Sequence, residues 1–488
     1  MEPKQVFEIF AQINQVPRPS KHEERISRWL QEWAKEHDIE CVADESMNVI
    51  MRVPATPGYE SHEGVILQAH MDMVCEKNGD VEHDFMNDPI QTWIDGEWLK
   101  AKGTTLGADN GIGIAMALAA ISNPELKHPA IECLFTVDEE TGLTGAFQLK
   151  DGMLRGKRLI NLDSEDDGQI FIGCAGGIDT LAKMHYEPVK VESLKLNVER
   201  IAIRISVSGL MGGHSGDDIN KGRANANQLL VWFLARIWPQ TEVQLASING
   251  GNLRNAIARE AEAVICIPLS YKEQIRIEWN HFTAQMEGVF GKVEKEMRLE
   301  LETCDMPETI IPTDKAYRLI MALCECPHGM IAMSKEMPGL VETSTNLASV
   351  KMRNESTMDG RSYIEVNTSQ RSSKEGSKHH LKWAVEQALS MACDEVTHGD
   401  GYPGWAPNPD SELLEVTKEA YKELFKADPQ VLAIHAGLEC GLFLEKYPYL
   451  DMVSIGPQMY GVHSPQERLS IPSTERCYRW LCRILEKL

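Results

Sequence analysis

The first 185 residues alternate short apolar runs with amphipathic or small-residue segments. Apolar runs of strand length cover residues 64–69, 131–137 and 158–162, and a fourth lies near residues 453–456. Residues 103–121 are a glycine-rich turn followed by a small-residue stretch, which is typical of a helix packed closely on a sheet. Strands that alternate with helices predict an α/β layer architecture.

A helix is also expected shortly after Ser20. Ser20 and Glu23 match the spacing of a capping box, in which two side chains satisfy the first N–H groups of a helix. The apolar residues from Ile26 to Trp33 follow at helical spacing, which predicts one buried stripe.

The middle of the chain has a different pattern. From about Tyr186, alternating strands such as residues 201–207 are separated by long polar helices such as residues 271–290. A stretch rich in glycine and proline at 399–410 resembles a return loop, and the last 80 or so residues are again α/β in pattern. No internal repeat is visible in the sequence. We therefore predict an outer domain of residues 1–185 and 396–488, interrupted by an α+β domain of residues 186–395.

Composition narrows the possible functions. The 488 residues carry 49 Lys and Arg against 73 Asp and Glu, a formal net charge of −24, which argues against binding to nucleic acid or to an anionic membrane. The N-terminal residues lack an apolar signal core, and no apolar stretch is long enough to span a bilayer. The twelve cysteines contain no C-x-x-C pair, which predicts reduced thiols in a cytoplasmic protein.

Side chains that can bind metals follow the apolar runs. His70, Glu140 and Asp163 each come just after one of the first three runs, His463 follows the fourth within GVHSP, and Asp109 opens the predicted small-residue helix. Ligands of an open α/β sheet bind beyond the carboxyl ends of its strands, so we expect these five side chains to converge. Taken singly, each of these residues could also have an ordinary structural role, for example as a helix cap, a solvated turn or a hydrogen-bonded loop residue.

Two imidazoles and three carboxylates suit zinc, with cobalt or manganese as possible substitutes. Five ligands are too many for one tetrahedral zinc ion, but they fit two ions if one carboxylate bridges them. Asp109 is the natural bridge, because a tight turn into a helix can present both oxygens to ions about 3.5–4 Å apart.

Two neighbouring carboxylates have the chemistry to assist such a site. Asp72 lies two residues after His70, where an extended backbone puts both side chains on one face, so it can orient the imidazole. Glu139 precedes Glu140 and can point into the cleft as the general base of metal-assisted hydrolysis.

Six motifs then resemble a known family: HMDMV at 70–74, GTTLGADNGIG at 103–113, FTVDEETGLTGA at 135–146, NLDSED at 161–166, GGHSGDDI at 212–219 and MYGVHSP at 459–465. They are similar to the co-catalytic di-zinc dipeptidases and exopeptidases related to carboxypeptidase G and peptidase T, and most of all to the aminoacyl-histidine dipeptidase branch. The resemblance implies a catalytic domain with a central mixed sheet flanked by helices, and an inserted lid and dimerisation domain.

The resemblance also implies roles for these residues. His70 and Asp163 would hold one zinc, Glu140 and His463 the other, and Asp109 would bridge them. Asp72 would orient His70, Glu139 would be the general base, and the Asp109–Asn110 peptide would be cis. Four further residues would contact the substrate: His214, Asn255, Arg371 and Glu439. Arg371, which also suits an ordinary surface position, would bind a carboxylate, and Glu439 would pair with an amino group.

The function expected from the sequence is hydrolysis of short unblocked dipeptides, Xaa-His and β-alanyl-histidine (carnosine) included, by a zinc-bridging water that Glu139 activates. The resemblance further implies a homodimer in which His214 acts on the partner's site. One alternative is an amidohydrolase of the same fold acting on N-acyl amino acids. Another is a binding protein without catalysis, which would have no use for Glu139.

Overall fold

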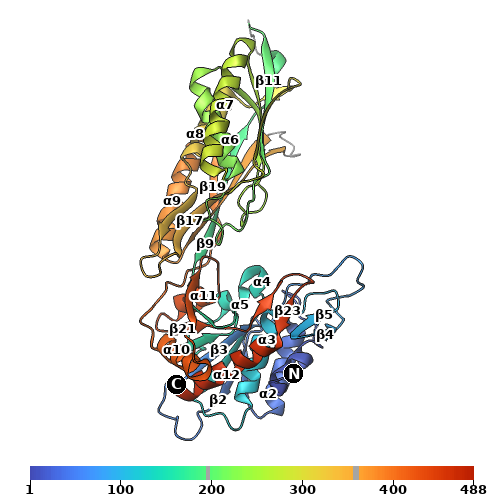
Figure 1. Cartoon of the computed structure of the whole chain (residues 1–488), viewed down its shortest axis with the longest axis vertical. Helices are drawn as coiled ribbons and strands as arrows, with labels where there is room; N and C mark the ends of the chain where they lie inside the picture. The colour runs from blue at the N-terminus through green and yellow to red at the C-terminus, as the bar shows by residue number, and fades with distance from the viewer. Residues whose placement is uncertain (194–197, 355–361) are drawn as a thin grey trace. The chain divides into compact units, whose positions relative to one another are not determined.

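The structure of the chain, a computed structural model, describes residues 1–193, 198–354 and 362–488. These residues form two compact units (Figure 1). Unit 1 consists of residues 1–174, 405–433 and 438–488, and unit 2 of residues 175–404 and 434–437. The chain leaves unit 1 where strand β9 (Gly176–Tyr186) starts, earlier than the boundary predicted near residue 186, because this strand already belongs to the sheet of unit 2. It returns within the 399–410 stretch.

An eight-stranded mixed sheet forms the centre of unit 1, in the order β1-β2-β6-β3-β7-β21-β8-β20. Its middle strands β6, β3, β7 and β21 run parallel, so their carboxyl ends lie at one edge. The strands are β1 (Glu40–Ala43), β2 (Val49–Val53), β3 (Val65–His70), β6 (Ile131–Thr136), β7 (Arg158–Asn161), β8 (Gln169–Cys174), β20 (Gln430–Ile434) and β21 (Asp451–Ser454).

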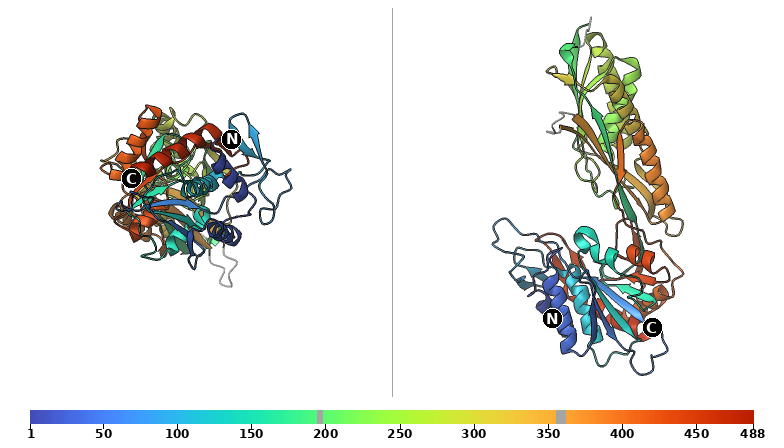
Figure 2. Two further views of the ribbon diagram at one scale, coloured as in Figure 1. Left: turned by 90° about the horizontal axis from the view of Figure 1, so that it is seen from below. Right: turned by 180° about the vertical axis from the view of Figure 1, so that it is seen from behind.

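The helices of unit 1 flank this sheet, some packed on its strands and others on neighbouring helices (Figure 2). They are α1 (Lys4–Ile13), α2 (Glu24–Glu36), α3 (Ala108–Ile121), α4 (Glu139–Gly142), α5 (Thr144–Gln148), α10 (Glu412–Phe425), α11 (Cys440–Lys446) and α12 (Ile471–Lys487). Helix α3 is buried along nearly its whole length between α1 and the strands β3 and β6. Its glycines and alanines permit this close approach, as the sequence predicted.

A smaller sheet of unit 1 carries one of the predicted ligands. Its order is β22-β23-β5-β4, with β4 (Thr92–Asp95), β5 (Trp98–Ala101), β22 (Met459–Tyr460) and β23 (Arg468–Ser470). The turn between the antiparallel strands β22 and β23 contains His463, in a left-handed backbone conformation with φ of 61°.

The predicted capping box at Ser20 is wrong, although helix α2 itself is present. Neither side chain caps the helix. The Ser20 hydroxyl donates to Asp72 Oδ2 at 2.8 Å, and Glu23 Oε1 accepts the Asp138 N–H at 3.0 Å. Ser20 thus binds a distant carboxylate, and Glu23 Oε1 is shared between the nearby Lys21 N–H at 2.8 Å and the distant Asp138 N–H, so that no capping box forms.

Unit 2 contains two halves of the same topology. One half runs β11–α6–β12–β13–α7–β14. The other begins with β9, is interrupted by the first half, and continues as α8–β17–β18–α9–β19, so each has the order strand–helix–strand–strand–helix–strand. The sheet order is β14-β11-β13-β12 in one half and β19-β9-β18-β17 in the other, the same relative order. The halves join where β12 pairs antiparallel with β17, at Asn249 with Lys351 and Gly250 with Val350. No repeat is visible in the sequence that would predict this duplication.

The strands of the two halves are β11 (Arg200–Ser208), β12 (Gln244–Gly250), β13 (Ala261–Pro268), β14 (Arg298–Cys304), β17 (Val341–Asn354), β18 (Ser362–Ser372) and β19 (Glu395–His398), in addition to β9. Strand β16 (Gly329–Met333) pairs with β17, and β10 (Val189–Lys190) with β15 (Thr309–Ile310). The helices are α6 (Ala226–Ile237), α7 (Lys272–Phe290), α8 (Thr313–Glu325) and α9 (Glu375–Ser390). All four helices contribute to one apolar core with the strands (Figures 1 and 2).

Two further expectations concern the whole chain. Among the described residues, every helix is too short or too polar to cross a membrane. The twelve cysteines all lie within the described ranges, and no two of them form a disulfide there.

Candidate metal and active site

Unit 1 gathers the predicted ligands at the carboxyl edge of its parallel strands. His70 is the last residue of β3, Glu140 lies in α4 just after β6, and Asp163 follows β7. Asp109 comes from the start of α3, and His463 from the turn of the small sheet. The parallel strands, the start of α3 and the turn of the small sheet thus bring together residues that lie far apart in the sequence, from His70 to His463.

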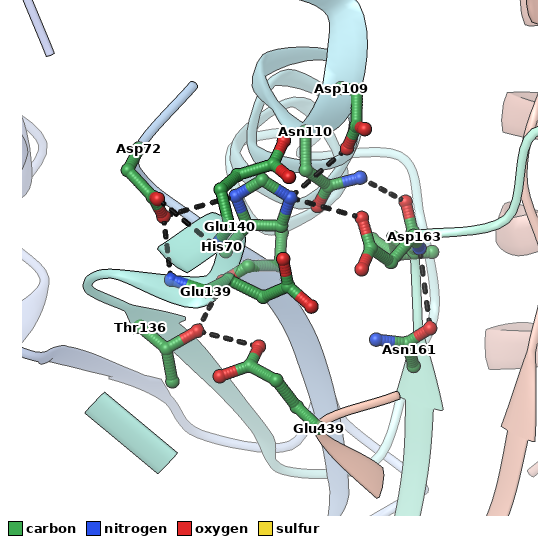
Figure 3. A network of polar contacts seen from close by, with 12 residues as sticks. His70, Asp72, Asp109, Asn110, Thr136, Glu139, Glu140, Asn161, Asp163 and Glu439 are labelled. Atoms are coloured by element: carbon green, nitrogen blue, oxygen red, sulfur yellow. Dashed lines mark hydrogen bonds and ion pairs between the residues drawn. The ribbon is translucent and has the colours of Figure 1, made fainter. Parts of the chain in front are cut away.

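The distances show Asp109 lying between the two imidazoles. Its Oδ1 is 3.0 Å from His70 Nε2, and its Oδ2 is 3.2 Å from His463 Nε2. Asp163 Oδ1 is 3.3 Å from the same His70 nitrogen, and Glu140 Oε2 is 3.1 Å from the His463 nitrogen. The five side chains therefore form two groups that share one carboxylate, and Figure 3 shows four of them.

This donor set fits divalent metal ions. Ligand atoms of His70, Asp109 and Glu140 all lie within 4.8 Å of one another. Asp163 Oδ1 is buried and, apart from its ion-pair contact with His70 at 3.3 Å, makes no hydrogen bond of regular geometry among the described residues, although a buried polar atom is normally satisfied. Nitrogen and oxygen donors without thiolates suit zinc, cobalt or manganese.

The charges of these groups shift one another's protonation. Hydrogen bonds to Asp109 and Glu140 raise the pKa of His463 to about 11. Burial lowers the pKa of His70, but the charges of Asp163 and its other carboxylate neighbours outweigh it and raise that pKa well above its usual value. The imidazoles are thus held by a strongly negative environment, which is also what favours a cation.

Asp72 connects the first imidazole to the Glu139–Glu140 peptide. Its Oδ1 is 3.3 Å from His70 Nδ1 and accepts the Glu139 N–H at 3.0 Å, and its Oδ2 accepts the Glu140 N–H at 3.2 Å. One buried carboxylate therefore sets both the ring orientation of His70 and the position of the two glutamates.

The two adjacent glutamates point to different places. Figure 3 shows the Glu140 carboxylate directed toward Asp109, and the Glu139 carboxylate lying below the His70 ring on the side of Asp163. Burial raises the pKa of Glu139 well above its usual value, with the negative charges of Asp163 and Glu439 adding to the effect. A carboxylate that binds protons readily has the character of a general base.

The start of helix α3 is tied to the end of β7. The Asp109–Asn110 peptide is cis, as the resemblance implied, and the Asn110 side chain donates to the Leu162 carbonyl at 2.8 Å. The residues before Asp163 thereby hold the segment that presents Asp109.

Glu439 lies beneath the same site and is 1 % exposed. Its Oε2 accepts hydrogen bonds from Gln68 Nε2 at 2.6 Å and Thr136 Oγ1 at 2.8 Å, while Oε1 has no hydrogen-bond partner among the described residues. Burial raises the pKa of Glu439 to about 8. One oxygen is thus committed to the sheet, and only the other is left for a ligand.

The other three predicted substrate-binding residues belong to unit 2. His214 Nδ1 lies 3.2 Å from Asp217 Oδ2, and Asn255 accepts the Ser215 N–H through its backbone carbonyl at 2.8 Å. Arg371, on β18, is 8 % exposed and donates to the Tyr402 hydroxyl at 3.0 Å, so it is not an ordinary surface arginine.

Sequence reasoning missed three residues. His435 in unit 2 shares a hydrogen bond of 2.7 Å with Ser344, and burial, with the charge of Arg371, lowers its pKa to about 4. Arg18 and Glu467 in unit 1 are buried charges that contact the segments carrying His70 and Asp109. The only available signal was the proximity of His435 and Glu467 to the motifs containing Glu439 and His463.

The fold and this group of metal-ligating side chains fit a metallopeptidase. The chain belongs to the peptidase family M20/M25/M40, whose model matches residues 66–487. Over its whole length it is 39% identical to the cytosol non-specific dipeptidase of Escherichia coli, of which it covers 98%. It matches the crystal structure of aminoacylhistidine dipeptidase from Vibrio alginolyticus with a TM-score of 0.93 and 38% identity, covering 100% of this chain and 97% of that one. The aminopeptidase PepT of Bacillus cereus shares the fold, with a TM-score of 0.62 and 16% identity, covering 100% of this chain and 99% of that one.

Proposed function

We propose that this protein is a metal-dependent dipeptidase that hydrolyses unblocked dipeptides, with Xaa-His substrates such as β-alanyl-histidine in its range. Its membership of the peptidase family and the names of its two full-length relatives support this proposal. The observation that carries it is the position of Glu139, a carboxylate beside the shared donor set and held by Asp72. A protein that only bound peptides would not need such a base.

Two zinc ions are the proposed cofactor, with cobalt or manganese as substitutes. His70 and Asp163 would hold one ion, Glu140 and His463 the other, and Asp109 both, in keeping with the two groups of contacts around Asp109. Metal ions in such sites polarise the scissile carbonyl and make water nucleophilic at neutral pH.

The chain's own groups would then move the proton. Glu139 accepts a proton from the attacking water at its carboxylate and delivers it to the nitrogen of the leaving residue. Asp72 keeps Glu139 in place through the backbone N–H and fixes the His70 ring. Neither role requires Glu139 to be a ligand.

Recognition of the dipeptide ends is the finer part of the proposal. Arg371 would bind the substrate carboxylate, because its guanidinium is always charged and bidentate, and Asn255 would assist it. His214 would stabilise the oxyanion, and the free oxygen of Glu439 would face the substrate amine. We further propose a homodimer in the cytoplasm, the compartment named for the Escherichia coli relative.

A comparison of three substrates tests the proposal. Zinc-loaded protein should release histidine from β-alanyl-histidine and alanyl-histidine, and much less from N-acetyl-histidine. A preference for N-acetyl-histidine would replace the proposal with the N-acyl amidohydrolase. Failure to cleave any Xaa-His or Xaa-Xaa dipeptide, in protein shown to contain metal, would favour the binding protein.

A further inference from the structure

The segment that presents Asp109 has an irregular backbone conformation. Residues 105–107 lie between β5 and α3, and Gly107 has φ of 67°. Asp109 and Asn110 have non-helical backbone angles although they lie in the first turn of α3. The orientation of the shared carboxylate must therefore depend on other groups.

Glu467 binds this segment through four consecutive backbone N–H groups. Its Oε2 accepts from Leu106 at 2.7 Å and from Gly107 at 3.1 Å, and its Oε1 accepts from Ala108 at 2.8 Å and from Asp109 at 3.4 Å. The side chain is 3 % exposed. A carboxylate in this place complements the free N–H groups at the start of a helix.

Arg18 binds the same segment through a carbonyl and joins it to the segment after β3. Its Nη2 donates to the Gly107 carbonyl at 2.5 Å, and its Nη1 donates to the carbonyls of Met71 and Asp72, both at 3.1 Å. The side chain is 1 % exposed. A Cβ atom on Gly107 would lie 2.5 Å from Nη2, so the guanidinium fills the space that this glycine leaves.

We propose that Arg18 and Glu467 are positioning residues of the metal site. Arg18 fixes the spacing between the segment of His70 and Asp72 and the segment of Asp109, and Glu467 fixes the direction in which Asp109 leaves the backbone. Together they set the affinity for the metal pair, although neither side chain is a ligand. This inference rests on the proposed metal site. It is tested by measuring metal binding and not turnover.

The chain supplies a matched control on β6. Glu132 is 6 % exposed, and its Oε2 accepts two consecutive backbone N–H groups, from Arg155 at 2.7 Å and Gly156 at 2.8 Å. It lies near the amino end of β6, whereas Glu140 follows the carboxyl end of that strand. Glu132→Gln therefore removes a buried carboxylate of the same kind without touching the ligand segments.

The experiment measures zinc affinity in the full-length variants Glu467→Gln, Glu132→Gln and Arg18→Lys, by competition with a chromophoric chelator. Circular dichroism and thermal unfolding show that each variant is folded, and the absorption spectrum of Co²⁺-loaded protein reports the ligand geometry. We expect Glu467→Gln to bind zinc about 10–100-fold more weakly than the wild type, the range for losing an outer contact of a metal ligand. Glu132→Gln should match the wild type in zinc affinity and in the cobalt spectrum, even where its thermal stability falls.

Arg18→Lys provides a second, independent test if Glu467→Gln does not fold. Lysine retains the buried charge, but its compact ammonium lacks the fork that reaches both segments, so zinc affinity should fall here too. Wild-type affinity in folded Glu467→Gln or Arg18→Lys, or an equal loss in Glu132→Gln, would overturn the positioning role and leave the proposed function intact. Failure of the wild-type protein to bind zinc, cobalt or manganese would overturn both.

Discussion

At the scale of single residues, the adjacent pair Glu139 and Glu140 carries most of the proposed chemistry. The two carboxylates point to different places, and both backbone N–H groups are held by Asp72. The pair thus divides into a general base and a metal ligand, although the two side chains are chemically alike. Position alone gives them different functions.

Substitution of each member separates the two roles. Glu139→Gln should keep both metals, because Glu139 is not a proposed ligand, and its turnover should fall by at least about 10²–10⁴-fold, since an amide cannot accept the proton. Glu140→Gln should instead weaken zinc binding. Zinc content and steady-state turnover on a dipeptide measure the two effects. If both variants lose metal alike, or both keep metal and lose turnover alike, the assignment within the pair is wrong.

At the scale of secondary-structure elements, the sequence was informative where hydrophobic periodicity and motif coincide. The strands before His70, Asp163 and Glu140 were each marked by an apolar run, and helix α7 begins and ends within a residue of its predicted bounds. Because parallel strands place their carboxyl ends at one edge, the convergence of these residues followed from their order alone.

Contacts between distant segments could not be predicted from hydrophobic periodicity and motifs. Ser20 and Glu23 match a local capping pattern, yet Asp72 and the Asp138 N–H, far along the chain, take their hydrogen bonds. Arg18 and Glu467 bind backbone groups, and every residue type has these groups, so the side-chain pattern does not identify their partners. The two halves of unit 2 share their strand order without a visible sequence repeat, because topology depends on hydrophobic pattern more than on residue identity.

A histidine at a strand junction of unit 2 predicts a pH-dependent stability. His328 Nδ1 accepts the Leu347 N–H of β17 at 3.0 Å, which requires a neutral ring, and burial lowers the pKa of His328 to about 4. The unfolded chain, with a pKa near 6.5, binds the proton first as the pH falls. The contribution of His328 to stability is therefore complete above about pH 6.5 and is lost progressively as the pH falls toward about 4.

Replacement of this histidine by asparagine tests the effect, because the amide oxygen can accept the same N–H and does not titrate. The free energy of unfolding of His328→Asn should fall less between pH 6.5 and pH 4 than that of the wild type. His380→Asn, at an exposed position of α9, is the control and should follow the wild type. An unchanged pH dependence in His328→Asn would show that this hydrogen bond does not govern the acid sensitivity.

At the scale of the whole molecule, the question is how many chains complete one active site. The resemblance implies that His214 acts on the site of a partner chain, which remains a prediction. Within unit 2 the edge strands β12 and β17 of the two halves already pair with each other. A second chain that extended the described sheet at its ends would therefore pair with β14 or β19.

Mixing two inactive variants tests the dimer. His214→Ala and Glu139→Ala, combined under conditions of proven subunit exchange, would give half mixed dimers, each with one complete site of two. If His214 acts on the partner chain, activity should recover to roughly a quarter of wild type. If it acts within its own chain, no site is complete in any dimer, and mixing restores nothing. The second result would discard the action of His214 between chains and leave the metal site unaffected.

The central claim is a pair of metal ions that share Asp109, and zinc content per chain tests it most directly. Elemental analysis of zinc-loaded wild-type protein should approach two equivalents, because each oxygen of Asp109 faces a different histidine. Asp109→Ala, checked for folding by circular dichroism, should lose most of both ions, since both share this ligand. Retention of two equivalents by Asp109→Ala would contradict the account.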